Sequence, residues 1–166
     1  MTEKAGSEFD YEICNNRIRP IAEALIAKYE ELRHIDPDKI LFVVNHKSSG
    51  SKKQMVLART SRISPKWTEI LYQLGACSYF YTIEFYAKTT AAMDESQIVA
   101  LVYRELRRIG PEGEILIPDV HDWWQILMGL GRKWFYPDST CPNLLDENVD
   151  WKKLMGQYYE KAGSAE

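Results

Sequence analysis

The chain has 166 residues, of which 45% are hydrophobic and 12% aromatic, which is enough to bury the core of one ordinary domain. The formal net charge of −3 argues against a basic surface of the kind that attracts nucleic acid or anionic membranes. The N-terminus lacks an apolar signal region, and no run reaches the ~20 apolar residues of a membrane span. We therefore expect a soluble, cytoplasmic protein without a membrane partner.

The spacing of the cysteines favours free thiols, and the composition of the chain ends indicates flexible termini. Cys14, Cys77 and Cys141 lie far apart and form no C-x-x-C pair, which favours free thiols over a disulfide or a thiolate zinc site. Residues 1–9 and 161–166 are small and polar, so we expect flexible ends around a single domain at 10–160.

The first half of the chain switches from helical to extended patterning. Apolar residues at helical spacing predict a first helix from Ile13 to Leu32. Ser64-Pro65 predicts the start of a short helix that reaches Gly75. Runs rich in β-branched and aromatic residues predict three strands, at 39–45, 54–64 and 79–87.

Two further helices are expected in the second half. One covers 94–109 with Asp94 as its N-cap, and the other runs from an N-cap at Asp119 to about Leu130. Helices and strands that follow one another in this order indicate an α+β fold, with a small three- or four-stranded sheet.

The helix expected at 94–109 carries an unusual carboxylate. On a helical wheel Glu105 falls inside the apolar arc, Arg104 and Arg108 fall at the edge of that arc, and Arg107 points to solvent. A buried carboxylate is costly unless it is paired, and Arg108, three residues on, can reach it. The alternative is an ordinary amphipathic helix whose Glu105 extends to the surface.

The spacing of these residues matches a known catalytic motif. In H-E-x-x-H metallopeptidases, two histidines on successive turns bind zinc, and the glutamate between them polarises the attacking water. A third ligand comes from elsewhere in the chain. Here His121 follows Arg108 by thirteen residues, within DVHDWW.

Three segments carry a resemblance to the putative phage metallopeptidase family, whose members are zincin-like and similar in outline to SprT-like peptidases. They are YTIEFY, YRELRRI and PDVHDWW, at 81–86, 103–109 and 118–124. The resemblance implies a zincin-like fold with a sheet packed on the first helix and on a former active-site helix. It also implies that Glu105 stands at the general-base position and His121 at a residual ligand position.

The chain departs from the family pattern at both helix-borne zinc ligands. Arg104 and Arg108 replace the histidines, and a guanidinium has no lone pair to give a metal. We therefore expect no cofactor in place of the ancestral zinc, and a catalytically inactive protein that binds a peptide or protein. Arg104 and Arg108 would recognise a carboxylate, and the strand at 79–87 would act as an edge strand that pairs with an extended peptide.

Several alternatives stay open. The chain could be an active metal-dependent peptidase with unrecognised ligands, in which Glu105 is the general base and His121 one ligand. It could also bind nucleic acid weakly through a flexible basic loop that contains Lys47, Lys52 and Lys53.

The other polar residues considered for the site can also be explained by a structural role. Glu84 either faces solvent or pairs with the arginines in the former cleft. Asp119 and Asp122 are first of all acids at a helix N-terminus, and second the partners of the arginines. His34 and His46 have no feature that places them near Glu105. Large aromatic residues late in the chain are expected in the core rather than at a ligand site; these are Trp123, Trp124, Trp134, Phe135 and Tyr136.

Overall fold

The computed structural model describes residues 9–47, 56–118 and 122–156, and it confirms the predicted α+β class. All the strands of the described residues lie before residue 87, with helices between some of them and three consecutive helices after the last strand. In the described part of the chain, no helix combines the length and apolar character that crossing a bilayer would require.

The described residues form two compact units. The sheet unit takes its residues from 9–20 and 36–91, and the helical unit from 21–35 and 92–156. Helix α1 (Asn15–Lys28) begins in the sheet unit and ends in the helical unit. The single domain expected at 10–160 stays a prediction.

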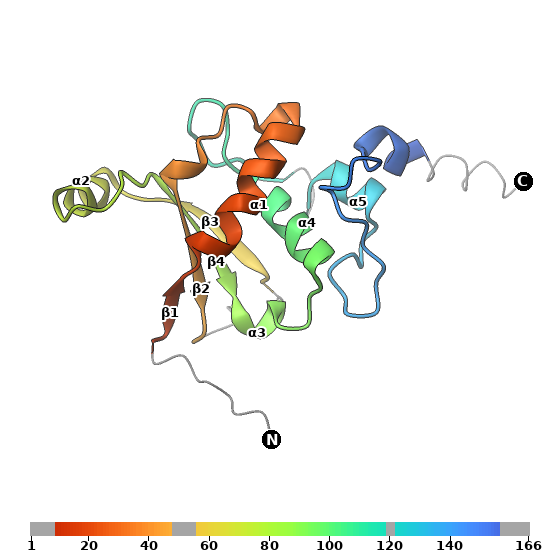
Figure 1. Ribbon diagram of the computed structural model, residues 1–166, viewed down its shortest axis with the longest axis horizontal. Coiled ribbons are helices and arrows are strands. Elements are labelled where there is room, and N and C mark those ends of the chain that lie inside the picture. Colours follow the sequence, from red (N-terminus) through yellow and green to blue (C-terminus); the bar gives the residue numbers. More distant parts are fainter. Residues whose placement is uncertain (1–8, 48–55, 119–121, 157–166) are drawn as a thin grey trace, which may run out of the picture. The chain divides into compact units, whose positions relative to one another are not determined.

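The sheet unit is built on four strands in the order β1-β2-β4-β3. Strand β2 pairs antiparallel with β1 and parallel with β4, and β4 pairs antiparallel with β3 (Figure 1). One face of the sheet supplies the core of this unit, because Ile40, Phe42, Ile83 and Phe85 are all buried. The strands are β1 (Tyr11–Ile13), β2 (Ile40–Asn45), β3 (Ala58–Arg62) and β4 (Tyr81–Tyr86).

The position of β4 corrects one expectation. The strand expected at the sheet edge, residues 79–87, is interior, with β2 on one side and β3 on the other. Its backbone therefore cannot take up a peptide by strand addition. β-Propensity identified the strand, but it carries no information on which neighbours the strand acquires.

The first helix is shorter than predicted. Residues 11–13 form β1, so Ile13 belongs to a strand, and a separate 3-10 turn, η1 (Glu30–Leu32), follows α1. Phe9, Tyr11 and Ile13 alternate along the chain and are exposed, a period-two pattern that the helical spacing of later residues obscured. A further 3-10 turn, η2 (Pro37–Lys39), leads into β2.

Two short helices complete the sheet unit. Helix α2 (Pro65–Gln73) begins where Ser64-Pro65 predicted, and none of its residues is buried. The second, α3 (Ala87–Thr90), was not predicted; it follows β4 directly, and the Thr89 hydroxyl donates to the carbonyl of Val56 at 2.8 Å.

The helical unit is organised around α4 (Glu95–Leu106). A capping box starts this helix: Asp94 accepts from the backbone N–H of Gln97, whose side chain accepts from the N–H of Asp94, as the Asp94 prediction implied. The helix ends three residues before the predicted Ile109. Most of its apolar residues are fully or almost fully buried, Val99, Leu101, Val102 and Leu106 among them, whereas Ile98 is half-buried.

The last predicted helix starts later than expected. Helix α5 (Trp124–Gly129) has Trp123 at its N-cap, so the assignment of Asp119 as the cap is wrong. Asp119 itself lies outside the described residues. The aromatic side chains of Tyr29, Tyr103 and Trp151 pack together, with ring centroids 5.1 to 6.1 Å apart.

Candidate functional site

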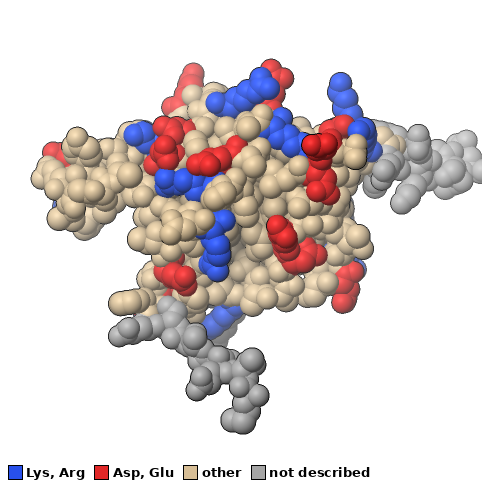
Figure 2. Space-filling view, in the orientation of Figure 1, with Lys and Arg blue, Asp and Glu red and all other residues tan. Residues whose placement is uncertain are grey.

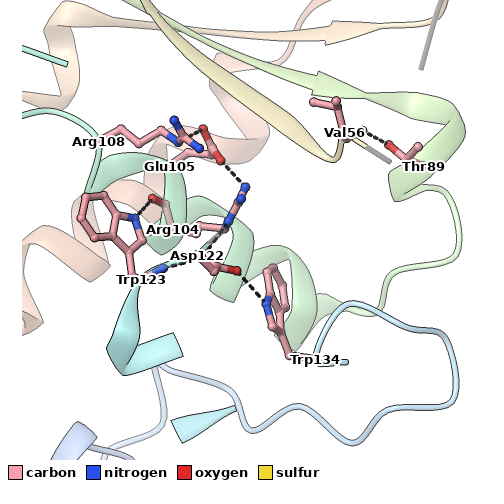
Figure 3. Close-up of polar contacts among 8 residues, drawn as sticks. All are labelled: Val56, Thr89, Arg104, Glu105, Arg108, Asp122, Trp123 and Trp134. Carbon is pink, nitrogen blue, oxygen red and sulfur yellow. Dashed lines mark hydrogen bonds and ion pairs between the residues drawn. The ribbon is translucent and has the colours of Figure 1, made fainter. Parts of the chain in front are cut away.

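The end of α4 presents a buried carboxylate between two guanidiniums. Glu105 has no exposed side-chain surface, which contradicts the alternative in which it reaches solvent. Nη1 of Arg104 lies 2.7 Å from its Oε1, and Nε of Arg108 lies 3.3 Å from its Oε2 (Figure 3). The pairing that the wheel predicted is therefore present, and each oxygen of Glu105 faces a different arginine.

A second carboxylate holds the other side of Arg104. Nε of Arg104 donates to Oδ1 of Asp122 at 2.9 Å, so this guanidinium bridges Glu105 and Asp122. Of the two sequence readings for Asp122, the one that made it a partner of the arginines is confirmed. Its reading as an acid at a helix N-terminus stays a prediction, since Asp122 directly precedes Trp123, the N-cap of α5.

Two tryptophans orient these groups. The backbone N–H of Trp123 donates to Oδ1 of Asp122 at 2.8 Å, and the indole of Trp134 donates to its Oδ2 at 3.2 Å. The indole of Trp123 donates to the backbone carbonyl of Arg104 at 2.9 Å (Figure 3). Both tryptophans are buried, whereas Trp124 and Tyr136 are exposed, so the core reading of the aromatic group holds only in part.

Arg107 differs from its prediction as a solvent-facing residue. It is half-buried, and its guanidinium lies 4.7 Å from the centroid of the Trp123 ring. It donates to the hydroxyl of Tyr103 at 3.2 Å and to the amide oxygen of Gln125. A helical wheel could not show these contacts, because residues from other segments of the chain cover this side of α4.

The charges of the ion-pair group, which consists of Arg104, Arg108, Glu105 and Asp122, sum to zero. Arg104 and Arg108 carry two positive charges, and Glu105 and Asp122 carry two negative charges. A buried charge without a counter-ion is strongly destabilising, whereas a paired and hydrogen-bonded one is tolerated. The arginines therefore supply the positive charge that this buried glutamate requires.

The donor atoms at the motif positions do not fit a zinc ion. Arg104 and Arg108 present only N–H groups, which point at Glu105 and, for Arg104, also at Asp122. Among residues 9–47, 56–118 and 122–156, no three His, Cys, Asp or Glu side chains gather as a metal site would require. His121, the remaining ligand position, lies outside the described residues.

The other histidines have partners of their own. In the helical unit, Nε2 of His34 lies 2.8 Å from the carbonyl oxygen of Ile109, which requires a proton on that nitrogen. In the sheet unit, Nε2 of His46 lies 3.1 Å from a carboxylate oxygen of Glu12. Neither histidine was expected to be a ligand of a zinc site at Glu105.

The remaining candidates belong to the sheet unit. Glu84 accepts a hydrogen bond from the amide of Asn45 at 2.5 Å. Nζ of Lys47 lies 3.1 Å from a carboxylate oxygen of Asp10, which offsets its charge. Lys52 and Lys53 lie outside the described residues. The basic loop therefore stays a prediction.

Sequence reasoning identified Glu105 and both arginines, but it missed the role of the tryptophans. The spacing of charges along one helix can be read from the sequence, because residues three and four apart share a face. The indole of Trp123 contacts a residue 19 positions away, and the indole of Trp134 contacts a residue 12 positions away. The cluster D-W-W beside a predicted helix was the only signal, and it did not specify which tryptophan would be buried.

An α+β fold in which Arg104-Glu105-x-x-Arg108 spans the C-terminal end of α4 is consistent with a metallopeptidase-like protein. The sequence model of the putative phage metallopeptidase family matches residues 9–159, and the chain belongs to this family. No curated protein and no solved structure shows a significant match to the chain.

Proposed function

We propose that this chain is a metallopeptidase-like pseudoenzyme on a zincin-like scaffold, and that it binds a peptide or protein instead of hydrolysing it. The observation that carries the proposal is the pairing of Glu105, whose two oxygens face Arg104 and Arg108. A general base must be free to take a proton from water. A fully buried carboxylate between two guanidiniums is not.

The two arginines differ in what they can offer a ligand. Arg104 is held by Glu105 and Asp122, and its side chain is 13% exposed. Arg108 is 24% exposed, and its Nε, which is itself buried, makes only the 3.3 Å ion pair with Glu105 among the described residues. Arg104 therefore has a structural role in this proposal, and Arg108 is the group that recognises a ligand carboxylate.

Strand β3 takes the place of 79–87 as the peptide-pairing element. It lies at the end of the strand order and pairs antiparallel with β4. Edge strands accept extended peptides by backbone hydrogen bonding. In this proposal β3 of the sheet unit binds peptide backbone. Independently of it, Arg108 of the helical unit binds an acidic side chain or a terminal carboxylate.

Restoration of the zinc ligands tests the zincin-like scaffold. Arg104→His with Arg108→His should create zinc affinity, measurable by calorimetry, if the scaffold has zincin geometry and His121 completes the site. Arg104→Gln with Arg108→Gln is the matched control, because it also removes both guanidiniums but supplies no imidazole. Equal zinc uptake by the two double variants, or none by either, would contradict the scaffold assignment.

Peptide binding tests the function directly. A library of peptides with free C-terminal carboxylates should yield binders of the wild type. The affinity of these binders should fall at least tenfold in Arg108→Gln, and their affinity for the wild type should also fall when the peptide is amidated. Arg132→Gln is the control, because Arg132 is an exposed arginine in the same unit. Zinc-dependent cleavage of any of these peptides that disappears in Glu105→Gln would instead establish an active peptidase.

A further inference from the structure

A groove in the sheet unit lies where strand β3 ends. Arg62, the last residue of β3, lines it together with Tyr81, its partner on β4, and helix α2 contributes Thr68 and Tyr72. The groove has a volume of about 360 Å³, near the lower end of the range of about 300–1,000 Å³ for ligand sites. A groove of this size suits one large side chain of a partner.

Hydrogen bonds hold the segments that form this groove. The Thr68 hydroxyl donates to the carbonyl of Tyr79 at 2.8 Å, which ties α2 to the residues before β4. The backbone N–H of Ile63 donates to the carbonyl of Phe80 at 2.8 Å, which continues the pairing of β3 with β4 into the groove. Figure 1 shows α2 set off from the strands of its unit. The groove is therefore formed before a ligand arrives, which lowers the cost of ordering it on binding.

The lining of the groove is rich in aromatic rings. Tyr72 is 65% exposed and Phe80 is 43% exposed, and Tyr81 is half-buried. Aromatic side chains pack favourably on other aromatic rings, in edge-to-face or offset arrangements. Figure 2 shows few charged side chains over α2. The groove therefore favours a flat apolar group, and among peptide side chains that group is the ring of Phe, Tyr or Trp.

The charges at the groove favour an acidic group near that ring. Arg62 lines the groove, and Nζ of Lys39 lies 5.4 Å from the centroid of the Phe80 ring. Neither cation takes part in an ion pair within the described part of the chain. Glu69 also lines the groove, and it accepts a hydrogen bond from Gln73 at 3.2 Å. Two positive charges and one negative charge leave one positive charge for a ligand to neutralise.

We infer that this groove is the side-chain pocket for a peptide on β3, and that it selects an aromatic residue with an acidic residue two positions away. The inference rests on the proposed peptide binding at β3. Alternate residues of an antiparallel strand direct their backbone groups to opposite sides. Ile63 bonds to Phe80, so the N–H and C=O of Arg62 point to the open edge of β3. A peptide on that edge therefore reaches the groove at Arg62.

The spacing of the two selected residues follows from the extended conformation of the peptide. Side chains two positions apart in a strand point to the same side. When the aromatic ring enters the groove, an acidic side chain two positions away therefore lies on the side of Arg62 and Lys39. A carboxylate there forms a charge-assisted contact with the guanidinium.

Nitrogen-15 NMR of the full chain tests the inference with the blocked peptide acetyl-Glu-Val-Phe-Val-Glu-amide. Binding should shift the amide signals of β3, α2 and Tyr81 as the peptide concentration rises. Replacement of Phe by Ala in the peptide should weaken binding by about threefold to tenfold, the contribution of an aromatic pair. Tyr72→Ala should weaken it to the same extent, whereas Tyr72→Phe keeps the ring and should bind as the wild type does.

A cycle between protein and peptide tests the charge. Arg62→Gln should weaken binding by about threefold to fivefold at low ionic strength. Replacement of both Glu residues of the peptide by Gln should weaken binding to the wild type, and should have less effect on the Arg62→Gln variant. Arg17→Gln is the matched control, because Arg17 is an exposed arginine of the sheet unit that does not line the groove.

The same spectra separate this inference from the function proposed above. Binding that is lost in Arg108→Gln but unchanged in Arg62→Gln and Tyr72→Ala would overturn the pocket and leave the role of Arg108 standing. The reverse pattern would support the pocket and contradict the role of Arg108. No shift at about 1 millimolar peptide would overturn the inference. A short single-stranded oligo(dT) that shifts the same amides at a lower concentration would overturn it too, and would assign the groove to nucleic acid.

Discussion

Replacement of Arg104 by methionine tests whether the ion-pair group stabilises the helical unit. The change removes the guanidinium but keeps an unbranched side chain of similar length. It takes away the 2.7 Å contact with Glu105 and the 2.9 Å contact with Asp122. The side chain of Glu105 is fully buried and that of Asp122 is 10% exposed, so each loses a counter-ion where water screens charge only weakly.

The expected loss is at the low end of the range for a broken buried ion pair. Removal of one partner of such a pair costs about 3–5 kcal/mol. Glu105 keeps Arg108 at 3.3 Å, and Asp122 keeps its bonds from Trp123 and Trp134. We therefore expect a loss of about 3 kcal/mol in the free energy of unfolding. For a chain of this size, that lowers the melting temperature by roughly 6–12 °C.

Urea unfolding followed by circular dichroism measures this loss, and a double-mutant cycle assigns it. Glu105→Gln removes the charge that Arg104 neutralises, so the double variant should be less destabilised than the two single variants combined, by about 1–3 kcal/mol. Arg132→Met, at an exposed arginine, should change stability by less than about 0.5 kcal/mol. An Arg104→Met variant as stable as this control, or an additive cycle, would refute the reasoning.

Three further predictions follow from local contacts. Asp94→Ala removes the capping box of α4 and should lower the free energy of unfolding by about 1 kcal/mol in the same assay; an unchanged midpoint would count against it. Iodoacetamide at pH 8 should modify Cys77, which is exposed, and leave Cys14 and Cys141 unmodified because both are buried; fast labelling of all three would contradict the burial. Burial raises the pKa of Cys14 to about 11 and that of Cys141 to about 12, from 9.0 in an exposed thiol. Because the pKa of each thiol is higher in the folded state, the stability that the buried, protonated thiols contribute is complete below pH 9. It is lost as the pH rises toward 11–12, by up to about 1.4 kcal/mol per pH unit for each thiol. The fall between pH 8 and 10 should be smaller in the double variant Cys14→Ala with Cys141→Ala, and an identical fall in that variant would rule out the thiols as its cause.

The sequence by itself determined the elements whose signals are local. The capping residue Asp94, the helix start at Ser64-Pro65 and the β-prone runs around β2, β3 and β4 are fixed by neighbouring residues. The burial of Glu105 and its pairing with Arg108 also follow from the spacing expected on one helix, whereas its contact with the adjacent Arg104 does not. Three short segments in the right order carried the resemblance to the putative phage metallopeptidase family, and the family model over residues 9–159 confirmed it.

The tertiary structure decided what depends on distant partners. Strand order made β4 an interior strand, since a strand's neighbours are set by the whole sheet and not by its own residues. The contact of Asp122 with Arg104 joins residues 18 positions apart, and it separates a structural arginine from Arg108, the one proposed to bind ligand. The exposure of Trp67 and Leu74 at α2 is likewise a tertiary result, because the neighbours that cover a helix are set by the whole fold.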